Sequence, residues 1–524
     1  MLDCIVVGSG PAGTAAALAL LERGASIRMV DVGLRLEDER QQIIRGLAGL
    51  PPDQWDQGEL ALLREGSDAD AKGLALKRLF GSDFPYRGAS ESLGLEIPEG
   101  SLKPSFALGG LSNTWGAVVL PYSECDLAGW PIGAADLAPH YREVGAYMPL
   151  AAAADRLAAE YPIHVEGPQL ALPSRQAARI LVHMERHRGR LERAGIRFGH
   201  ARIAMRTVEC RRCGMCLVGC PYDLIFNTRQ VLDRIRTEPR FAYFSGLVVR
   251  RVEERGDQVV IRAEDAQTGA PRELRADRCF LAAGVIPTAR IVLESLGRED
   301  RPLNLLDSQY NVLPLLALRS TPGVEHEELH TLCQIFLEVD DPGLSRHNIH
   351  CQIYTYNELY KTALRKMGGG LIAQLPLVRG ALLGRLMVAL CYLHSDDSGR
   401  VRLRLERRRG ARAGALVAEP ERSPRTGRVV RGLVWKLLRH ARGLGFAAAP
   451  AVHIAAPGRG FHTGGTFPMS ARPADGQTNL AGCLPAWRRI HLVDASVFPT
   501  IPSSTITYSV MANAHRIASR AAES

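Results

Sequence analysis

Lysine and aromatic residues are scarce in this 524-residue sequence, and their scarcity argues against a nucleic-acid partner. Only six of the 65 basic residues are lysine, and aromatic residues make up 6% of the chain. An arginine bias of this kind is more typical of a GC-rich genome than of a nucleic-acid site. The basic run from Arg402 to Arg431 contains almost no interleaved aromatic residue, so we expect a solvated loop or face there.

Long hydrophobic runs are also missing. The most apolar stretch, Leu371 to Leu393, is interrupted by proline, glycine and arginine, which argues against a membrane-spanning helix. We expect a helix with one buried face in a substrate-binding domain, and peripheral membrane contact is the alternative. No signal peptide precedes the first predicted strand, which begins within three residues of Met1, so the expected location is the cytoplasm.

The eleven cysteines lack the dispersed pattern of an extracellular disulfide framework, because four of them fall within residues 210–220. The rest of the composition, 46% hydrophobic and 23% charged, is that of a soluble globular protein. A chain of this length has room for two large domains or one interleaved pair.

The N-terminal residues carry the clearest motif. A short apolar run at residues 3–8 predicts a strand buried on both faces, and it leads into Gly8, Gly10 and Gly13 with the spacing G-x-G-x-x-G. A helix-forming segment follows, and a second predicted strand ends at Asp31. Glycines at this spacing allow a tight turn, close approach to a pyrophosphate and helix–strand packing, while the acid can bind a ribose hydroxyl. The motif predicts a dinucleotide site but does not choose FAD over NAD.

The order of predicted elements indicates an α/β fold, in which a nucleotide-binding domain of discontinuous segments surrounds an inserted α+β substrate domain built on an antiparallel sheet. A β-meander with a turn at Gly256-Asp257 and a further strand–turn–helix unit follow the cysteines. We expect five segments. They are the first part of the nucleotide-binding domain with a lid-like insertion (1–132), cap helices (133–200), the cysteine segment and second part (201–304), the substrate domain (305–450) and the C-terminal part (451–524).

Five stretches, in order along the chain, resemble the glucose–methanol–choline (GMC) flavoprotein oxidoreductases. They are VVGSGPAGTAAA, GGLSNTWGA, FLAAGVIPTARIVLES, FHTGGTFPM and LVDASVFPTIPSSTITYSVMANA. The resemblance implies that the predicted nucleotide-binding domain is a Rossmann-type FAD-binding domain. It also implies hydride transfer from an alcohol carbon to flavin N5.

The same resemblance implies the catalytic residues. His462 matches the family's catalytic histidine, and a neutral imidazole can take the hydroxyl proton while the flavin takes the hydride. Where the family usually has a second histidine or an asparagine, this chain has Thr505, which can hydrogen-bond a substrate oxygen but cannot act as a base. Thr114 stands where some relatives attach the flavin through a histidine, so we expect non-covalent FAD.

The expected FAD contacts come from five places in the chain. They are Gly8, Gly10, Gly13 and Asp31 in the N-terminal motif, Gly110, Asn113 and Thr114 near the isoalloxazine ring, Val248 or Val249 at the adenine, Ala283 and Gly284, and Asp494 and Ala495 in the C-terminal turn.

The clustered cysteines follow the spacing C-x2-C-x2-C-x3-C-P, with Cys210, Cys213, Cys216 and Cys220 as candidate metal ligands. This is the spacing of bacterial ferredoxins, whose thiolates hold an iron–sulfur cluster. A 3Fe–4S centre on the first three, or a 4Fe–4S centre with Cys220 or a remote cysteine, both fit. The alternatives are structural zinc, whose ligand pairs usually lie farther apart in sequence, and thiols or disulfides without metal. The large subunits of FAD glucose dehydrogenases, which are GMC relatives, resemble this arrangement and carry an iron–sulfur centre.

We therefore expect an enzyme that oxidises a sugar-like or other polyol hydroxyl to a carbonyl with FAD. The iron–sulfur centre would pass electrons singly to a carrier protein or a small electron-transfer subunit, which favours a dehydrogenase over an oxidase. The alternatives are an electron-transfer or accessory flavoprotein and a redox-neutral FAD-dependent isomerase or epimerase.

Overall fold

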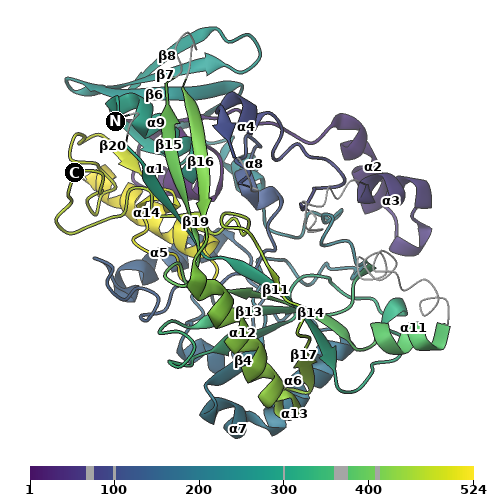
Figure 1. Cartoon of the computed structure of the whole chain (residues 1–524). Coiled ribbons are helices and arrows are strands. Elements are labelled where there is room, and N and C mark those ends of the chain that lie inside the picture. The colour runs from purple at the N-terminus through teal and green to yellow at the C-terminus, as the bar shows by residue number, and fades with distance from the viewer. Residues whose placement is uncertain (66–75, 98–101, 299–300, 359–375, 408–413, 524) are drawn as a thin grey trace.

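The computed structural model describes residues 1–65, 76–97, 102–298, 301–358, 376–407 and 414–523. Figure 1 shows two layered regions, with the first and last helices in the upper half and a broad antiparallel sheet in the lower half. The predicted mixed α/β class is confirmed. Among the described residues, no helix has the length and the hydropathy that a membrane crossing requires.

A five-stranded parallel sheet forms the centre of the upper region. Its spatial order is β20-β9-β1-β2-β5, which in chain order reads 5-4-1-2-3, the arrangement of doubly wound dinucleotide-binding sheets. β1 is apolar and almost fully buried because it lies between two strands of the sheet and packs against the helix that follows it. The strands are β1 (Asp3–Val7), β2 (Ser26–Val30), β5 (Phe241–Phe244), β9 (Arg278–Leu281) and β20 (Ile490–Leu492).

The helices around this sheet come from the whole length of the chain. The first helix packs against the last, so that the two ends of the sequence close one core. Segments far apart in sequence thus share one core around this sheet. The helices are α1 (Pro11–Glu22), α5 (Ala134–Tyr147), α8 (Thr228–Ile235), α9 (Val285–Leu296) and α14 (Thr507–Glu523).

Two further sheets, of three and of five strands, extend the upper region. β6 and β7 form a hairpin whose turn is Gly256-Asp257, as predicted, whereas the preceding β5 joins the parallel sheet instead of the meander. The strands are β6 (Leu247–Arg255), β7 (Gln258–Asp265) and β8 (Pro271–Ala276) in one sheet, and β19 (Thr463–Gly464), β10 (Leu303–Asp307), β15 (Arg400–Glu406), β16 (Ala415–Glu421) and β3 (Leu95–Glu96) in the other.

The lower region is a seven-stranded antiparallel sheet. β4, from the predicted cap segment, pairs with β12 of the predicted substrate domain, so that both segments belong to one sheet. The strands are β17 (Phe446–Ala448), β11 (Tyr310–Ala317), β14 (Leu386–Tyr392), β13 (Ile349–Tyr354), β12 (Ile335–Val339) and β4 (Ile196–His200), with β18 (His453–Ile454) beside β11.

The two faces of this sheet differ in chemistry. One face is apolar and packs with the buried sides of α6 and α12 into a separate core. The opposite face carries buried polar and aromatic side chains, including those of Glu338, His350 and Tyr392. The outer helices are α6 (Arg175–Arg186), α7 (Arg188–Arg193), α11 (Pro376–Leu383), α12 (Pro424–Arg439) and α13 (Ala441–Leu444).

The prediction of one helix over Leu371 to Leu393 was wrong in its second half. A short helix, α11, ends at Leu383, and residues 386–392 form strand β14. β14 is hydrogen-bonded to β11 on one side and β13 on the other, so pairing within the sheet overrides the helical preference of its residues. Residues 371–375 lie outside the described residues.

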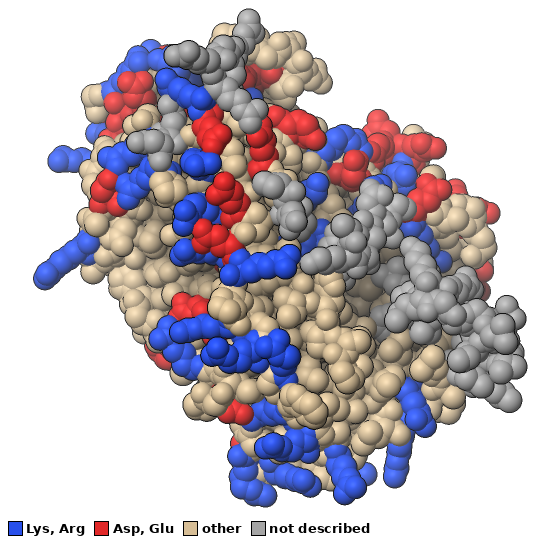
Figure 2. Space-filling view, in the orientation of Figure 1, with Lys and Arg blue, Asp and Glu red and all other residues tan. Residues whose placement is uncertain are grey.

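The first part of the basic run that begins at Arg402 lies on a solvated strand face. On β15, Arg400, Arg402 and Arg404 alternate with buried apolar residues and face acidic side chains of the same sheet. Figure 2 shows blue and red side chains interleaved over this upper part of the molecule, while blue side chains predominate at the lower end.

Candidate active site

The glycine motif forms the predicted turn between β1 and α1. Gly8 has a φ of +101°, and a Cβ built there would lie 2.5 Å from the carbonyl oxygen of Ala282. A Cβ on Gly13 would lie 1.9 Å from the carbonyl oxygen of Gly8, so this helix approaches its strand as closely as glycine allows. Gly10 caps α1 without a side-chain hydrogen bond, which leaves the first amides of the helix open to a ligand.

A large cavity lies at this helix end. Its open space is about 1360 Å³, including the solvent at its mouth. The N-terminus of α9, after Gly284, opens onto the same cavity. The predicted residues that line it are Gly8, Gly10, Asp31, Gly110, Val248, Val249, Ala283, Gly284, Asp494 and Ala495.

Asp31 stands at the end of β2, where the motif predicts it. Ser9 donates a hydrogen bond to its carboxylate and accepts one from the Gly109 amide (2.9 Å), which ties the acid to the glycine-rich loop. Burial raises the pKa of Asp31 to about 6, although the hydrogen bonds from Ser9 and Tyr243 lower it. The carboxylate therefore lines the cavity in a position suited to a sugar hydroxyl.

Asp494 joins the C-terminal turn to the start of α9. Its Oδ2 accepts hydrogen bonds from the Gly284 amide (3.1 Å) and the Thr288 hydroxyl (2.6 Å), and its Oδ1 accepts one from the Ser496 amide (3.0 Å). Burial raises the pKa of this carboxyl in spite of those bonds. Asp494 thus fixes the wall of the cavity that Gly284 and Ala495 form.

The glycine-rich loop separates two cavities. Gly110 and Leu111 line the large one, whereas Ser112, Asn113 and Trp115 line a second. Asn113 is held by bonds to the carbonyls of Leu108 (2.9 Å) and Gly110 (2.7 Å). Neither Asn113 nor Thr114 is among the described residues that line the large cavity, so their contact with the isoalloxazine ring stays a prediction.

His462 lies beside the large cavity, between the lining residues Phe461 and Thr463. Its ring stacks on Tyr392 of the antiparallel sheet, with centroids 4.7 Å apart. Burial, and to a smaller extent the neighbouring His350, lower the pKa of His462 to about 4. Within the described structure its Nδ1 is buried without a hydrogen-bond partner. His462 is therefore a neutral imidazole at the junction of the two regions.

Thr505 directly precedes the lining residues Ile506 and Thr507, but its hydroxyl already has a structural partner. The buried Leu120 amide donates a 2.7 Å hydrogen bond to Thr505 Oγ1. This bond anchors the loop after the glycine-rich segment to the C-terminal turn. It leaves the hydroxyl proton and one oxygen lone pair to interact with a substrate.

Replacing Thr505 with alanine is expected to lower the free energy of unfolding by about 1–3 kcal/mol, because it leaves the Leu120 amide buried and unpaired. Serine at this position keeps the acceptor and should restore most of the stability. Denaturant titration of the two variants measures the effect. An alanine variant with unchanged stability but lost turnover would instead make Thr505 a substrate-binding residue.

The cysteine segment lies against the second cavity, which Cys216 and Cys220 line together with Lys77. The lid-like insertion covers it, since α2 (Asp38–Ala48) and α3 (Gln57–Arg64) contribute to one apolar cluster with Met215. Burial raises the pKa of Cys213 to about 11 and that of Cys216 to about 12.

The four thiols form no disulfide bond, and the structure does not bring them together around a single ion. Among the described residues, the group of three metal-binding side chains whose donor atoms lie within 4.8 Å of one another is His347, His394 and Asp396. In a tetrahedral zinc site with zinc–sulfur bonds of about 2.3 Å, the thiolate sulfurs would lie closer to one another than this limit. The arrangement in the structure is thus not a preformed zinc site.

Sequence reasoning missed two buried residues next to His462. Glu338 on β12 and His350 on β13 are both 0% exposed and lie 2.6 Å apart, from Oε1 to Nδ1. The signal in the sequence was the alternation HNIHCQIY, in which polar and apolar residues take turns along a strand. That pattern shows a polar face but not that His462, over 100 positions later, would lie against it.

Comparison with known proteins agrees with this architecture. Residues 447–514, which include His462 and Thr505, match the family model described as GMC oxidoreductase. This C-terminal part of the chain is thus similar to the GMC oxidoreductases. No curated protein matches the sequence. The predicted resemblance to the family is confirmed over residues 447–514, while the subgroup with a ferredoxin-like cysteine cluster stays a prediction.

Solved structures of two kinds of oxidase share the whole fold. Pyridoxine 4-oxidase from Mesorbium loti superposes with a TM-score of 0.60 at 13% identity, covering 99% of each chain. A formate oxidase superposes with a TM-score of 0.60 at 14% identity, covering 99% of this chain and 98% of the other. A mutant formate oxidase of Aspergillus oryzae RIB40, studied for FAD modification, gives 0.58 at 14% identity. At these identities the likeness shows the fold alone.

Proposed function

We propose that this protein is a GMC oxidoreductase that uses non-covalently bound FAD to oxidise an alcohol, of sugar-like or other polyol type, to a carbonyl compound. The observation that carries the proposal is the position of His462. It lies between two residues that line the cavity at the glycine motif, and it stacks against the polar face of the antiparallel sheet. A substrate bound between the sheet and the cavity would therefore touch both the imidazole and the cofactor.

The residues that line the cavity fit FAD. Two helix N-termini, those of α1 and α9, present free amides of the kind that bind a pyrophosphate. Asp31 is placed for a ribose hydroxyl, and Val248 and Val249 supply an apolar surface for a base. When bound, FAD supplies a two-electron acceptor for the hydride of the alcohol carbon.

The chain's own residues orient the alcohol and receive its proton. A neutral His462 can accept the hydroxyl proton as the carbon–hydrogen bond breaks. Its low pKa keeps it unprotonated across the neutral range. Tyr392 fixes the plane of the ring by stacking, so the imidazole is positioned before the substrate arrives.

The cysteine segment supports an electron exit from this site. A single turn, Gly110–Asn113, separates the cavity proposed for FAD from the second cavity, which Cys216 and Cys220 line. An iron–sulfur cluster on Cys210, Cys213, Cys216 and Cys220 would supply one-electron transfer there. The acceptor would then be a one-electron carrier protein or a small electron-transfer subunit.

The flavin of the purified protein is expected to be released by acid precipitation, because Thr114 offers no side chain for a covalent link to FAD. Anaerobic mixing with a panel of polyols, sugars, pyridoxine and formate should then bleach the flavin with at least one alcohol and accumulate a carbonyl product. Flavin that stays on the denatured polypeptide contradicts the non-covalent part. A flavin that no alcohol reduces contradicts the proposed activity and favours an accessory flavoprotein or a redox-neutral enzyme.

A further inference from the structure

The polar face of the antiparallel sheet carries a continuous row of side chains across its strands. Strand register places Glu338 opposite His350, His350 opposite Tyr392, and Tyr392 opposite Tyr310. Residues paired in this way point to the same face of a sheet. His462 stacks on Tyr392, so the row runs directly beneath it.

Glu338 and His350 form a buried hydrogen-bonded pair in this row. The 2.6 Å contact joins Oε1 of Glu338 to Nδ1 of His350, and the Asn348 amide donates to the other carboxylate oxygen. A carboxylate is acceptor-only when ionised, so the imidazole donates through Nδ1–H. The lone pair of the neutral ring is then on Nε2, which is the nitrogen that can accept a proton.

That Nε2 is the unusual atom of the pair. Within the described structure it is buried and has no hydrogen-bond partner. A buried polar atom without a partner costs free energy, and a ligand that donates to it recovers that cost. His350 lies close enough to His462 to lower its pKa, and the Nδ1 of His462 is likewise unpartnered. Two imidazoles with unsatisfied nitrogens therefore lie near one another between the two regions.

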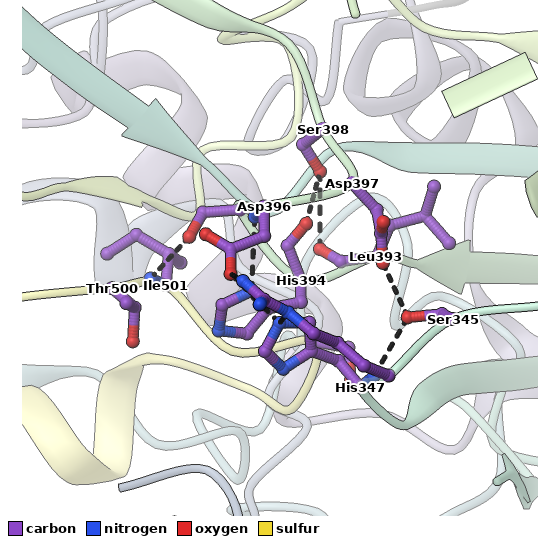
Figure 3. A network of polar contacts seen from close by, with 12 residues as sticks. Ser345, His347, Leu393, His394, Asp396, Asp397, Ser398, Thr500 and Ile501 are labelled. Carbon is purple, nitrogen blue, oxygen red and sulfur yellow. Dashed lines mark hydrogen bonds and ion pairs between the residues drawn. The ribbon is translucent and has the colours of Figure 1, made fainter. Parts of the chain in front are cut away.

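The end of the β13–β14 ladder is held in place by a polar cluster, which Figure 3 shows. The rings of His347 and His394 stack with centroids 3.5 Å apart, and Asp396 bonds His347 at 2.9 Å. In the same loop, Ser395 exchanges two hydrogen bonds with Ile501, at 2.8 Å and 3.1 Å. This cluster fixes the sheet edge against the C-terminal turn, two positions beyond the row that contains His350 and Tyr392.

Thr505 cannot act as a second base, because the threonine side chain has no basic group. Its Oγ1 also already accepts a hydrogen bond from the Leu120 amide. His462 can accept the hydroxyl proton, but the charge that then forms needs a carboxylate nearby to balance it. Among the described residues, no hydrogen bond or ion pair joins a carboxylate to His462, whereas His350 has a carboxylate within hydrogen-bonding distance of its Nδ1. A carboxylate in that position orients an imidazole and stabilises its protonated form.

We propose that His350 is a second catalytic imidazole of this site, which binds the substrate hydroxyl through Nε2 and shares with His462 the proton that the hydroxyl releases, with Glu338 as its positioning residue. The assignment rests on the proposed alcohol oxidation. In that reaction the carbinol hydrogen leaves with its electron pair to FAD, the single hydroxyl proton is held by the imidazole pair of His462 and His350, and the substrate becomes a carbonyl compound. The charge that forms on this pair is balanced by the carboxylate of Glu338.

The test measures flavin reduction under anaerobic conditions in His350→Leu, His350→Gln and Glu338→Gln, with the alcohol that reduces the unmodified protein fastest. Leucine fills the site but offers no acceptor, so we expect a loss of at least roughly 100-fold in the rate at saturating substrate. Glutamine at 350 offers an acceptor oxygen but no base, so it should retain tighter substrate binding than leucine. Glu338→Gln keeps an acceptor for Nδ1–H but removes the negative charge. We therefore expect this variant to reduce the flavin more slowly with a nearly unchanged KM.

The matched control is Cys351→Ala, on the same strand but on its opposite, apolar face. It removes buried volume without touching the polar row, and we expect unchanged flavin reduction. Thermal unfolding and bound FAD, measured for every variant, separate a folding defect from a chemical one. Undiminished reduction in His350→Leu and Glu338→Gln, with an active unmodified protein, overturns the assignment alone. An unmodified protein that no alcohol reduces overturns the proposed function and this assignment with it.

Discussion

Replacing His462 with alanine should leave FAD bound and slow flavin reduction by the alcohol about 10²–10⁴-fold, the usual contribution of a positioned acid–base group. This corresponds to about 3–5.5 kcal/mol in the activation free energy. FAD binding should persist because the amides of the α1 and α9 termini and the carboxylate of Asp31 lie elsewhere in the cavity wall. Stopped-flow absorbance of the flavin under anaerobic conditions measures the rate.

His462→Asn serves as a matched variant, because it keeps a polar side chain of similar reach but has no titratable nitrogen. It should be as slow as, or slightly faster than, the alanine variant. His453, on strand β18, is the control histidine and should tolerate alanine without such a loss. If His462→Ala reduced as fast as the unmodified protein, the proton acceptor would lie elsewhere, and His453→Ala and His350→Leu would identify it.

The fold of the half that carries the glycine motif could be predicted from the sequence because its determinants are local. The glycine spacing, the apolar strand before it and the acid at the next strand end are each readable within 31 residues. The structure leaves no room for a Cβ at Gly8 or Gly13 and places Asp31 in the wall of the cavity. The residues of the C-terminal turn could be predicted only through a family resemblance, since nothing in their own spacing connects Asp494 to the start of α9.

The substrate side could not be predicted because its determinants are pairings between distant strands. Tyr392 lies under His462 only because residues 386–392 form a central strand, in a stretch whose apolar run suggested a helix. Glu338 and His350 are 12 positions apart, yet their contact depends on the register of β12 against β13. A shift by one residue would place both on the apolar face.

Cys213→Ser is expected to abolish iron binding in protein prepared under anaerobic conditions and to lower turnover with a one-electron protein acceptor steeply, by at least roughly tenfold. The ferredoxin spacing places the thiols of one short segment around a common space, and the cavity beside Cys216 and Cys220 gives that space room. FAD content and flavin reduction by the alcohol should stay near those of the unmodified protein, since the glycine motif lies in a different wall. Iron, acid-labile sulfide and FAD measured on the same sample check each part.

Cys125→Ser is the matched control, because Cys125 is an exposed thiol outside the cysteine segment. It should keep iron, sulfide and acceptor turnover. Zinc without iron in the unmodified protein would contradict the cluster and make the segment a structural metal site, which would require the thiols to move closer together than they lie here. If Cys213→Ser kept full turnover with the one-electron acceptor, the cysteines would have no part in electron transfer. The flavin would then pass its electrons directly to an acceptor such as oxygen, and the lid formed by α2 and α3 would cover a purely structural segment.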